Sequence, residues 1–392
     1  MANHSATAKR ILPLIVFAQF ACTSLWFAGN AVLPELQQAF HLSVSSMGNL
    51  TSSVQLGFIL GTLVFALLSI SDRFSPSKVF FVCAIAGAIV NFSSTLVSSS
   101  SSLFMLRGSV GFFLAGIYPV GMKISSDYHE KGLGKALGYL VGALVVGTAL
   151  PHLIRILSAS LNWHMVIYST SALAILGGCI VYLFVPDGPF RKQGSKFDLS
   201  LCFTIFKKKE FRSAAFGYFG HMWELYTVWA FIPFLIIYYN TQNTSQLNVG
   251  LWSFITIASG GVACVLGGYW AEKRGSSKTA YLALLISGVC CIFSIFSFQV
   301  PTSIFLLFLI LWGASVVADS PQFSALIAQH APVQGRGTAL TIVNSIGFAI
   351  TIPSLQIMTV LVERFDPNIV FASLAIGPLL GLMAMGRSKI IE

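Results

Sequence analysis

The sequence is short of charge. Only 9% of its 392 residues are Asp, Glu, Lys or Arg, whereas a soluble domain carries about 25%. The polar residues that would cover a water-exposed surface are therefore missing. This composition excludes a cytosolic enzyme, a nucleic-acid-binding protein and a disordered chain.

The sequence also lacks paired cysteines. Its cysteines have neither the spacing of a metal site nor that of an extracellular disulfide framework, so we interpret them as small apolar side chains. The seven cysteines are Cys22, Cys83, Cys179, Cys202, Cys264, Cys290 and Cys291.

Long apolar runs take the place of charge. Hydrophobic residues make up 55% of the chain, and the mean hydropathy is +0.80. A helix that crosses a bilayer needs about 20 mostly apolar residues, and none of the runs alternates as barrel strands do. We therefore predict an all-α membrane protein with twelve transmembrane helices. The runs lie near 11–33, 44–68, 79–98, 103–125, 135–157, 164–186, 212–238, 250–271, 279–299, 303–328, 337–361 and 369–386.

The positive charges predict the orientation. Nearly all Lys and Arg residues fall in alternate loops, and only Arg107, Arg155 and Arg364 lie inside a span or on the other side. Lys and Arg mark cytoplasmic loops, so both termini and the central loop with Lys207–Lys209 are expected in the cytoplasm. The net charge of +10 is then information about topology and requires no nucleic acid partner.

Two pairs of similar segments, with nearly the same separation along the chain, indicate an internal repeat. Segment 71–78 follows the second run and segment 268–278 follows the eighth, and in each an acid, a base and a turn residue recur at the same spacing. The second echo pairs the fourth and tenth runs. It consists of Pro119, 132–137 and Pro151 in the first half and of Pro321, 335–340 and Pro353 in the second.

At these residues the chain resembles the major facilitator superfamily (MFS). Asp72, Arg73 and Lys78 fit the family signature Gly-x-x-x-Asp-Arg-x-Gly-Arg/Lys-Arg/Lys, although Leu68 and Ser75 replace its two glycines. The corresponding segment of the second half is closer to this signature and has Gly268, Glu272, Lys273 and Gly275. Segment 107–111 is similar to Arg-x-x-Gln-Gly without the Gln, and segment 186–191 looks like the motif that ends the first bundle in many members.

The resemblance implies the fold and the general activity. It implies a bacterial-type secondary transporter with two pseudo-symmetric six-helix bundles, at 1–190 and 212–392, and a cytoplasmic linker at 191–211. The two bundles would expose a site near the bilayer midplane to each side in turn. A monomer in the bacterial inner membrane, with no cofactor and no enzymatic activity, is expected.

The resemblance also implies a conformational switch on the cytoplasmic side. Asp72 would meet the positive N-terminus of a helix in the other bundle, and Arg73 and Asp127 would complete a charge cluster. The other switch candidates are Lys78, Glu272 and Lys273. The alternative is that Asp72, Arg73 and Lys78 form only a tight turn with orienting charges.

His152 and Arg155 of the fifth span are expected near the outer surface. Four other ionisable residues lie well inside predicted spans and are functional candidates, because charge is costly there. They are Arg107 in the fourth span, His221 and Glu224 in the seventh, and Asp319 in the tenth. The family's central cavity is lined by spans one, four, seven and ten. Arg107 could instead be structural, and His221 could bond a neighbouring helix. Glu224 is the predicted proton carrier, with His221 or Arg107 as modulator and Asp319 as the rival carrier.

The first span carries a polar and aromatic stripe on one face, which is unlikely to meet lipid. We expect this stripe to line the substrate and proton cavity. Its members are Gln19, Thr23, Trp26 and Asn30.

A proton-coupled transporter of a small organic solute is the leading prediction. The alternatives are a divalent-cation transporter with His221, Glu224 and Asp319 as ligands, and a drug or metabolite efflux antiporter, although span five lacks most of the antiporter signature. An integral-membrane enzyme has little support, because no His-rich cluster, Ser-x-x-Lys pair or nucleotide loop is present.

Overall fold

The computed structural model describes residues 2–42, 46–128, 133–158, 160–191, 204–332 and 335–386. Within these ranges the chain forms helices and connecting turns and contains no strand. The predicted all-α fold class is therefore confirmed.

The chain divides into two compact units. One comprises Met1–Leu42 and Ser53–Phe197, and the other comprises Ser43–Ser52 and Asp198–Glu392. The expected linker at 191–211 includes the change from one unit to the next, and its residues 192–203 lie outside the described residues.

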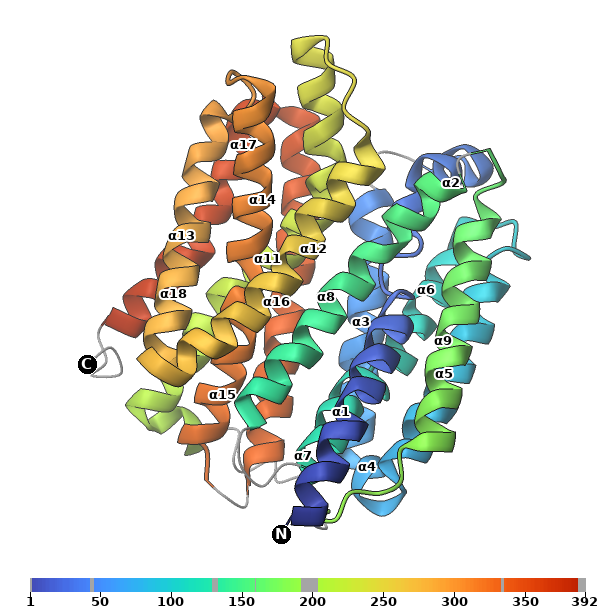
Figure 1. Ribbon diagram of the computed structural model, residues 1–392. Helices are drawn as coiled ribbons and strands as arrows, with labels where there is room; N and C mark the ends of the chain where they lie inside the picture. Colours follow the sequence, from blue (N-terminus) through green and yellow to red (C-terminus); the bar gives the residue numbers. More distant parts are fainter. Residues whose placement is uncertain are drawn as a thin grey trace. The chain divides into compact units, whose positions relative to one another are not determined.

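The first half of the chain supplies the helices coloured blue to green in Figure 1. The helix α5 packs along α9, and α1 packs against both α8 and α9. The elements are α1 (Ala2–Thr23), η1 (Asn30–Val32), α2 (Leu33–Phe40), α3 (Ser46–Leu67), α4 (Ile70–Arg73), α5 (Pro76–Ser93), α6 (Ser100–Leu114), α7 (Tyr118–Tyr128), α8 (Leu133–Leu157) and α9 (His164–Phe184).

The second half supplies the helices coloured yellow to red (Figure 1). The helix α12 packs along α14, and α11 packs along α18 and α16. The elements are η2 (Ile205–Lys207), α11 (Lys209–Asn243), α12 (Val249–Arg274), α13 (Ser276–Ser297), α14 (Thr302–Ala318), α15 (Ser320–His330), α16 (Arg336–Arg364), α17 (Pro367–Val370), η4 (Phe371–Ala375) and α18 (Ile376–Gly386).

Among the described residues, 11 helices are long and apolar enough to span a membrane, and Arg10–Thr23 is apolar but shorter. The predicted first span continued as one helix to residue 33. In the structure α1 ends at Thr23, and residues 24–29 form turns before η1 begins. The apolar run is therefore long enough, but its backbone is broken.

Two helix breaks occupy equivalent places in the repeat. The fourth span is divided into α6 and α7, and the tenth into α14 and α15. Pro119 and Pro321 are each the second residue of the helix that follows the break. Proline has no N–H to donate and clashes with the preceding turn, so the repeated prolines explain both breaks.

Glycine contacts repeat in the same way. A methyl group added at Gly111 of α6 would collide with the carbonyl oxygen of Val54 on α3. A methyl group added at Gly313 of α14 would collide with the carbonyl oxygen of Thr256 on α12. Small residues allow this close backbone approach between helices in membranes. The two halves thus share contacts as well as sequence echoes.

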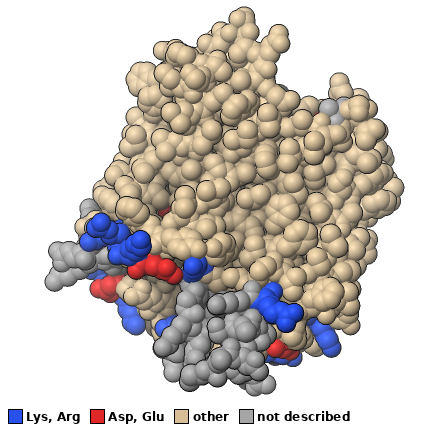
Figure 2. Space-filling model, in the orientation of Figure 1, with Lys and Arg blue, Asp and Glu red and all other residues tan. Residues whose placement is uncertain are grey.

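The outer surface is apolar. Leu56, Leu266 and Leu307 are all more than half exposed. In each unit, the charged side chains visible in Figure 2 gather at one end of the helices, toward the bottom of the view. A surface of this kind suits lipid rather than water, as expected for an integral membrane protein.

Candidate functional site

Glu224 lies at the centre of a polar cluster in the second unit. Its side chain is fully buried on α11. Trp312 of α14 donates its indole N–H to Oε1 at 2.6 Å, and Cys291 of α13 donates its thiol to the same atom at 3.2 Å. Ser287 of α13 donates to Oε2 at 3.0 Å. Glu224, Ser287, Cys291 and Trp312 are called the Glu224 cluster below.

The packing of the helices explains how these donors reach Glu224. Ser287 and Cys291 are four residues apart on α13, so they share one helix face. Gly313 brings α14 against the backbone of α12, and the adjacent Trp312 packs against Phe308 at 5.3 Å between ring centres. The cluster is therefore held by three helices.

All three donors in the Glu224 cluster are neutral groups. A carboxylate in an apolar environment is costly to charge unless it is paired, and three hydrogen bonds to neutral groups offset only part of that cost. Glu224 is therefore placed where gaining or losing a proton changes the local energy strongly.

The second polar feature is a pair between His221 and Asp319. His221 lies three residues before Glu224 on α11, and Asp319 occupies the break between α14 and α15. His221 Nδ1 and Asp319 Oδ1 are 2.8 Å apart, and both side chains are buried. The distance allows an ion pair when the imidazole is protonated. Both residues stood out in the sequence, but their direct contact was not predicted from it.

The three candidate metal ligands do not form one group among the described residues. His221 pairs with Asp319, while Glu224 is held by its own three donors. Within the described ranges, no group of three or more His, Cys, Asp or Glu residues is placed to hold a metal ion. The arrangement therefore gives no support to the divalent-cation alternative.

Arg107 satisfies the broken backbone of the first span. From α6 its two terminal nitrogens donate to the carbonyl oxygens of Leu25 and Trp26 at 2.8 and 2.9 Å, and to Asn91 Oδ1 at 2.9 Å. Asn91 of α5 in turn donates to the hydroxyl of Thr170 on α9 at 3.1 Å. Arg107 therefore links α6 to α5 and to the broken first span within the first unit, and its role in transport stays a prediction.

The predicted polar stripe of the first span is buried. Thr23 donates to the carbonyl oxygen of Gln19 at 2.8 Å, and Trp26 packs on Phe58 with 4.9 Å between ring centres. The amide of Gln19 has no hydrogen-bond partner among the described residues. Asn30 is the first residue of η1, beyond the break. Gln19 and Thr23 thus lie on α1, Trp26 lies within the break and Asn30 lies beyond it, so the four residues do not share one continuous helix.

The candidate switch residues are only partly brought together. Lys123 of α7 lies 3.0 Å from Asp72 and 3.8 Å from Asp127. Arg191 donates to the carbonyl oxygens of Asp72 and Phe74 at 3.1 and 2.8 Å. We call these residues the α4–α7 charge cluster. From the sequence, Lys123 served only to predict orientation, whereas Arg191 also belonged to the motif-like segment 186–191.

The remaining switch candidates lie outside this cluster. Arg73, Lys78, Glu272 and Lys273 form no ion pair with any other residue that the structure describes. Glu272 and Lys273 are exposed in the last turn of α12.

Some signals in the sequence could have revealed the missed partners. Trp312 precedes Asp319 by seven residues, which places both on one face of a helix. Asn91 is a polar residue inside an apolar run. The partners of Arg107 on α1 are backbone carbonyls, and these leave no side-chain signature in a sequence.

Comparisons with known proteins agree with this architecture. The family model described as Major Facilitator Superfamily matches residues 15–355. The transporter YybF of Bacillus subtilis is 22% identical over 214 residues, which are 52% of this chain and 52% of that protein. The galacturonate transporter of Dickeya chrysanthemi is 23% identical over 261 residues, covering 61% of this chain and 74% of that protein. The chain thus spans about half the length of YybF.

Solved structures show the same fold. The nucleoside transporter NupG has a TM-score of 0.72 at 17% identity, covering 96% of this chain and 98% of its own. The human organic anion transporter MFSD10 has a TM-score of 0.78 at 15% identity, covering 96% and 99%. Together with the repeated breaks and glycine contacts, the match to most of the chain places this protein in the Major Facilitator Superfamily of membrane transporters.

Proposed function

We propose that this protein moves a small organic solute across the bacterial inner membrane, coupled to protons and by alternating access. The observation that supports proton coupling is the Glu224 cluster, in which a fully buried carboxyl group has only neutral donors. The proposed carrier of the coupled proton is Glu224.

The proposed solute is a polar organic molecule. The names of its relatives include a galacturonate transporter, a nucleoside transporter and an organic anion transporter. These solutes are all polar organic compounds, and none is a metal ion. We therefore propose a polar organic solute and name no single compound.

The His221–Asp319 pair has a supporting role in this proposal. The pair joins α11 to the α14–α15 break. Its His221 lies three residues before Glu224 on α11. When Glu224 loses its proton, a protonated His221 would stabilise the new charge. Asp319 remains the rival carrier, because it is also a buried carboxyl group.

The proposed topology has both termini and the linker in the cytoplasm, with bundles at 1–190 and 212–392. The α4–α7 charge cluster then lies on the cytoplasmic side, where it would favour one of the two access states. Equilibria between such states involve a few kcal/mol, so a small number of charged contacts is enough to shift them.

The test uses purified protein in proteoliposomes with radiolabelled galacturonate and uridine. Glu224→Gln imitates the protonated carboxyl group, so it should retain counterflow of a transported solute but lose accumulation driven by a pH gradient. Glu210→Gln is the matched control, because Glu210 is an exposed carboxylate on the same helix.

The outcomes separate the two carriers. If Glu224→Gln still concentrates the solute while Asp319→Asn does not, the carrier is Asp319. If both variants still concentrate it, neither carboxyl group carries the obligatory proton and the coupling mechanism is wrong.

A further inference from the structure

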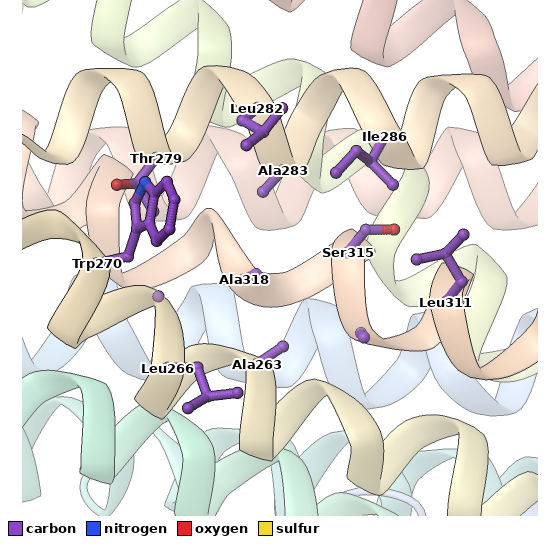
Figure 3. Close-up of a pocket in the computed structure, with 12 residues that line it drawn as sticks. Ala263, Leu266, Trp270, Thr279, Leu282, Ala283, Ile286, Leu311, Ser315 and Ala318 are labelled. Carbon is purple, nitrogen blue, oxygen red and sulfur yellow. The ribbon is translucent and has the colours of Figure 1, made fainter. Parts of the chain in front are cut away.

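A groove on the surface of the second unit has no place in the transport proposal. It lies between α12, α13 and α14 and has a volume of about 310 Å³, comparable to a small-ligand pocket. Figure 3 shows side chains from α12 and α13 on either side of α14. Its lining includes Leu266 and Trp270 on α12, Leu282 and Ile286 on α13, and Leu311 and Ala314 on α14.

The lining of this groove suits hydrocarbon. Of its twelve lining residues, only Thr279 and Ser315 carry a hydroxyl group, and the Ser315 hydroxyl already donates to the Trp312 carbonyl oxygen at 3.2 Å. Leu266 and Leu311 are 63% and 49% exposed, so the groove opens on the outer surface of the unit. Binding of a polar solute would need hydrogen-bonding groups that this groove lacks.

One end of the groove is positively charged. Trp270 lies at this end beside Thr279 (Figure 3), and the Arg274 guanidinium lies 5.9 Å from the centre of the Trp270 ring. Lys273 is exposed in the last turn of α12 and Lys278 in the first turn of α13, and Glu272 is the single acid in these two turns. The charge at this end is therefore positive overall.

The start of α13 adds to this positive potential. The helix begins at Ser276 after Gly275, and no side chain caps its N-terminus. The first N–H groups of a helix have no partner within it, and together with the helix dipole they favour an anion. An apolar groove that ends at three cations and a helix N-terminus matches a lipid with hydrocarbon chains and a phosphate.

We propose that this groove binds one anionic phospholipid. An acyl chain lies between α12, α13 and α14, and the headgroup phosphate meets Arg274, Lys273 and Lys278. Trp270 occupies the boundary between chain and headgroup, which is where tryptophan is enriched in membrane proteins. This site is independent of the proposed transport activity.

The headgroup is tested by counting lipids that remain bound to the purified full chain in native mass spectrometry. Phosphatidylglycerol should be retained in preference to phosphatidylcholine. Arg274→Gln combined with Lys278→Gln should weaken phosphatidylglycerol retention about thirtyfold, since each cation contributes roughly fivefold near a lipid surface. Arg155→Gln with Arg364→Gln is the control, because it removes the same charge away from the groove.

The acyl chain is tested by filling the groove. Ala314→Phe should abolish retention while leaving every charge in place. Leu307→Phe is the matched control, because Leu307 is 66% exposed on the same helix and does not line the groove. Monodisperse elution of each variant verifies folding.

Three results would overturn the proposal. The first is equal retention of both lipids by the unchanged protein, which would make the groove an ordinary lipid contact. The second is unchanged retention by both the charge variant and Ala314→Phe. The third is a dimer that Ala314→Phe dissociates, which would assign the groove to a second copy of the chain.

Discussion

Arg107 shows how one buried cation can be satisfied without a carboxylate. Its guanidinium bonds two backbone carbonyls at the break in the first span and the amide oxygen of Asn91. Arginine suits this task because its planar group presents several donors in fixed directions. Lysine has a single nitrogen and cannot reach three acceptors in the same way.

Replacing Arg107 should therefore destabilise the first unit. Arg107→Met leaves three buried acceptors without their donor, and each unsatisfied group costs about 1–3 kcal/mol. We expect a loss of roughly 3–5 kcal/mol in the free energy of unfolding, measured by thermal unfolding in detergent. Arg107→Lys should recover only part of this loss.

The matched control is Arg155→Gln. Arg155 pairs with Glu35, and both side chains are about one quarter exposed, so this change should cost no more than about 1 kcal/mol. Equal destabilisation by Arg107→Met and Arg155→Gln would contradict the structural role of Arg107.

At the residue scale, the sequence predicted which ionisable groups lie inside the helices better than it predicted what they touch. Arg107, His221, Glu224 and Asp319 stand out because charge is rare inside apolar runs. Their partners are on other helices or on the backbone, and spacing along one helix does not reveal contacts between helices. Trp312 is the clearest example, since its apolar run also contains Phe305 and Phe308 and nothing in the run marks Trp312 as the partner of Glu224.

At the scale of helices, close packing depends on a few glycines. Gly111→Ala and Gly313→Ala would each place a methyl group against a backbone carbonyl, which cannot rotate away. Overpacking of this kind typically costs about 1–3 kcal/mol, and because the contact is repeated, we expect similar losses of thermal stability in both variants.

Gly268→Ala provides the control on α12. A methyl group at Gly268 would meet nothing within 4 Å, and alanine favours a helix over glycine by up to about 1 kcal/mol. The variant should be as stable as the unchanged protein or more so. Losses confined to one of the Gly111 and Gly313 variants would argue against equivalent packing in the two units.

The α4–α7 charge cluster is also an interaction between elements. Asp72 and Lys123 are 23% and 21% exposed, so their ion pair contributes no more than about 1 kcal/mol to stability. Asp72→Asn should therefore leave the melting temperature nearly unchanged but alter the rate of solute counterflow. Asp366→Asn, which changes an exposed acid outside the cluster, serves as control. An unchanged counterflow rate for Asp72→Asn would contradict the switch.

The sequence predicted the helices more completely than their breaks. The twelve apolar runs and the two prolines at 119 and 321 were visible, and the structure confirms helices at these places. The break after Thr23 was missed because no proline or glycine marks it before Gly29. The break is stabilised by a residue far away in the sequence, since Arg107 donates hydrogen bonds to the carbonyl groups at the break.

At the scale of the whole molecule, the one-sided distribution of charge predicts topology. The cysteine of a Lys207→Cys variant should react with an impermeant thiol reagent only after the cells are opened. The cysteine of a Thr244→Cys variant should react in intact cells, because position 244 follows the other end of α11. Both variants are made in a background without the native cysteines. Labelling of position 207 from outside would reverse the orientation.

The broken first span has a consequence for how the protein is made. Trp26 and Arg107 are 81 residues apart, and a growing chain lengthens by about 5–20 residues each second. The backbone carbonyls at the break are therefore synthesised about 4–16 s before Arg107, which donates the hydrogen bonds to them. During that time the segment must keep them in contact with water or with the insertion machinery, because lipid offers them no hydrogen bond. The first span is thus completed by the fourth, so insertion of the first unit depends on the order in which its spans are made.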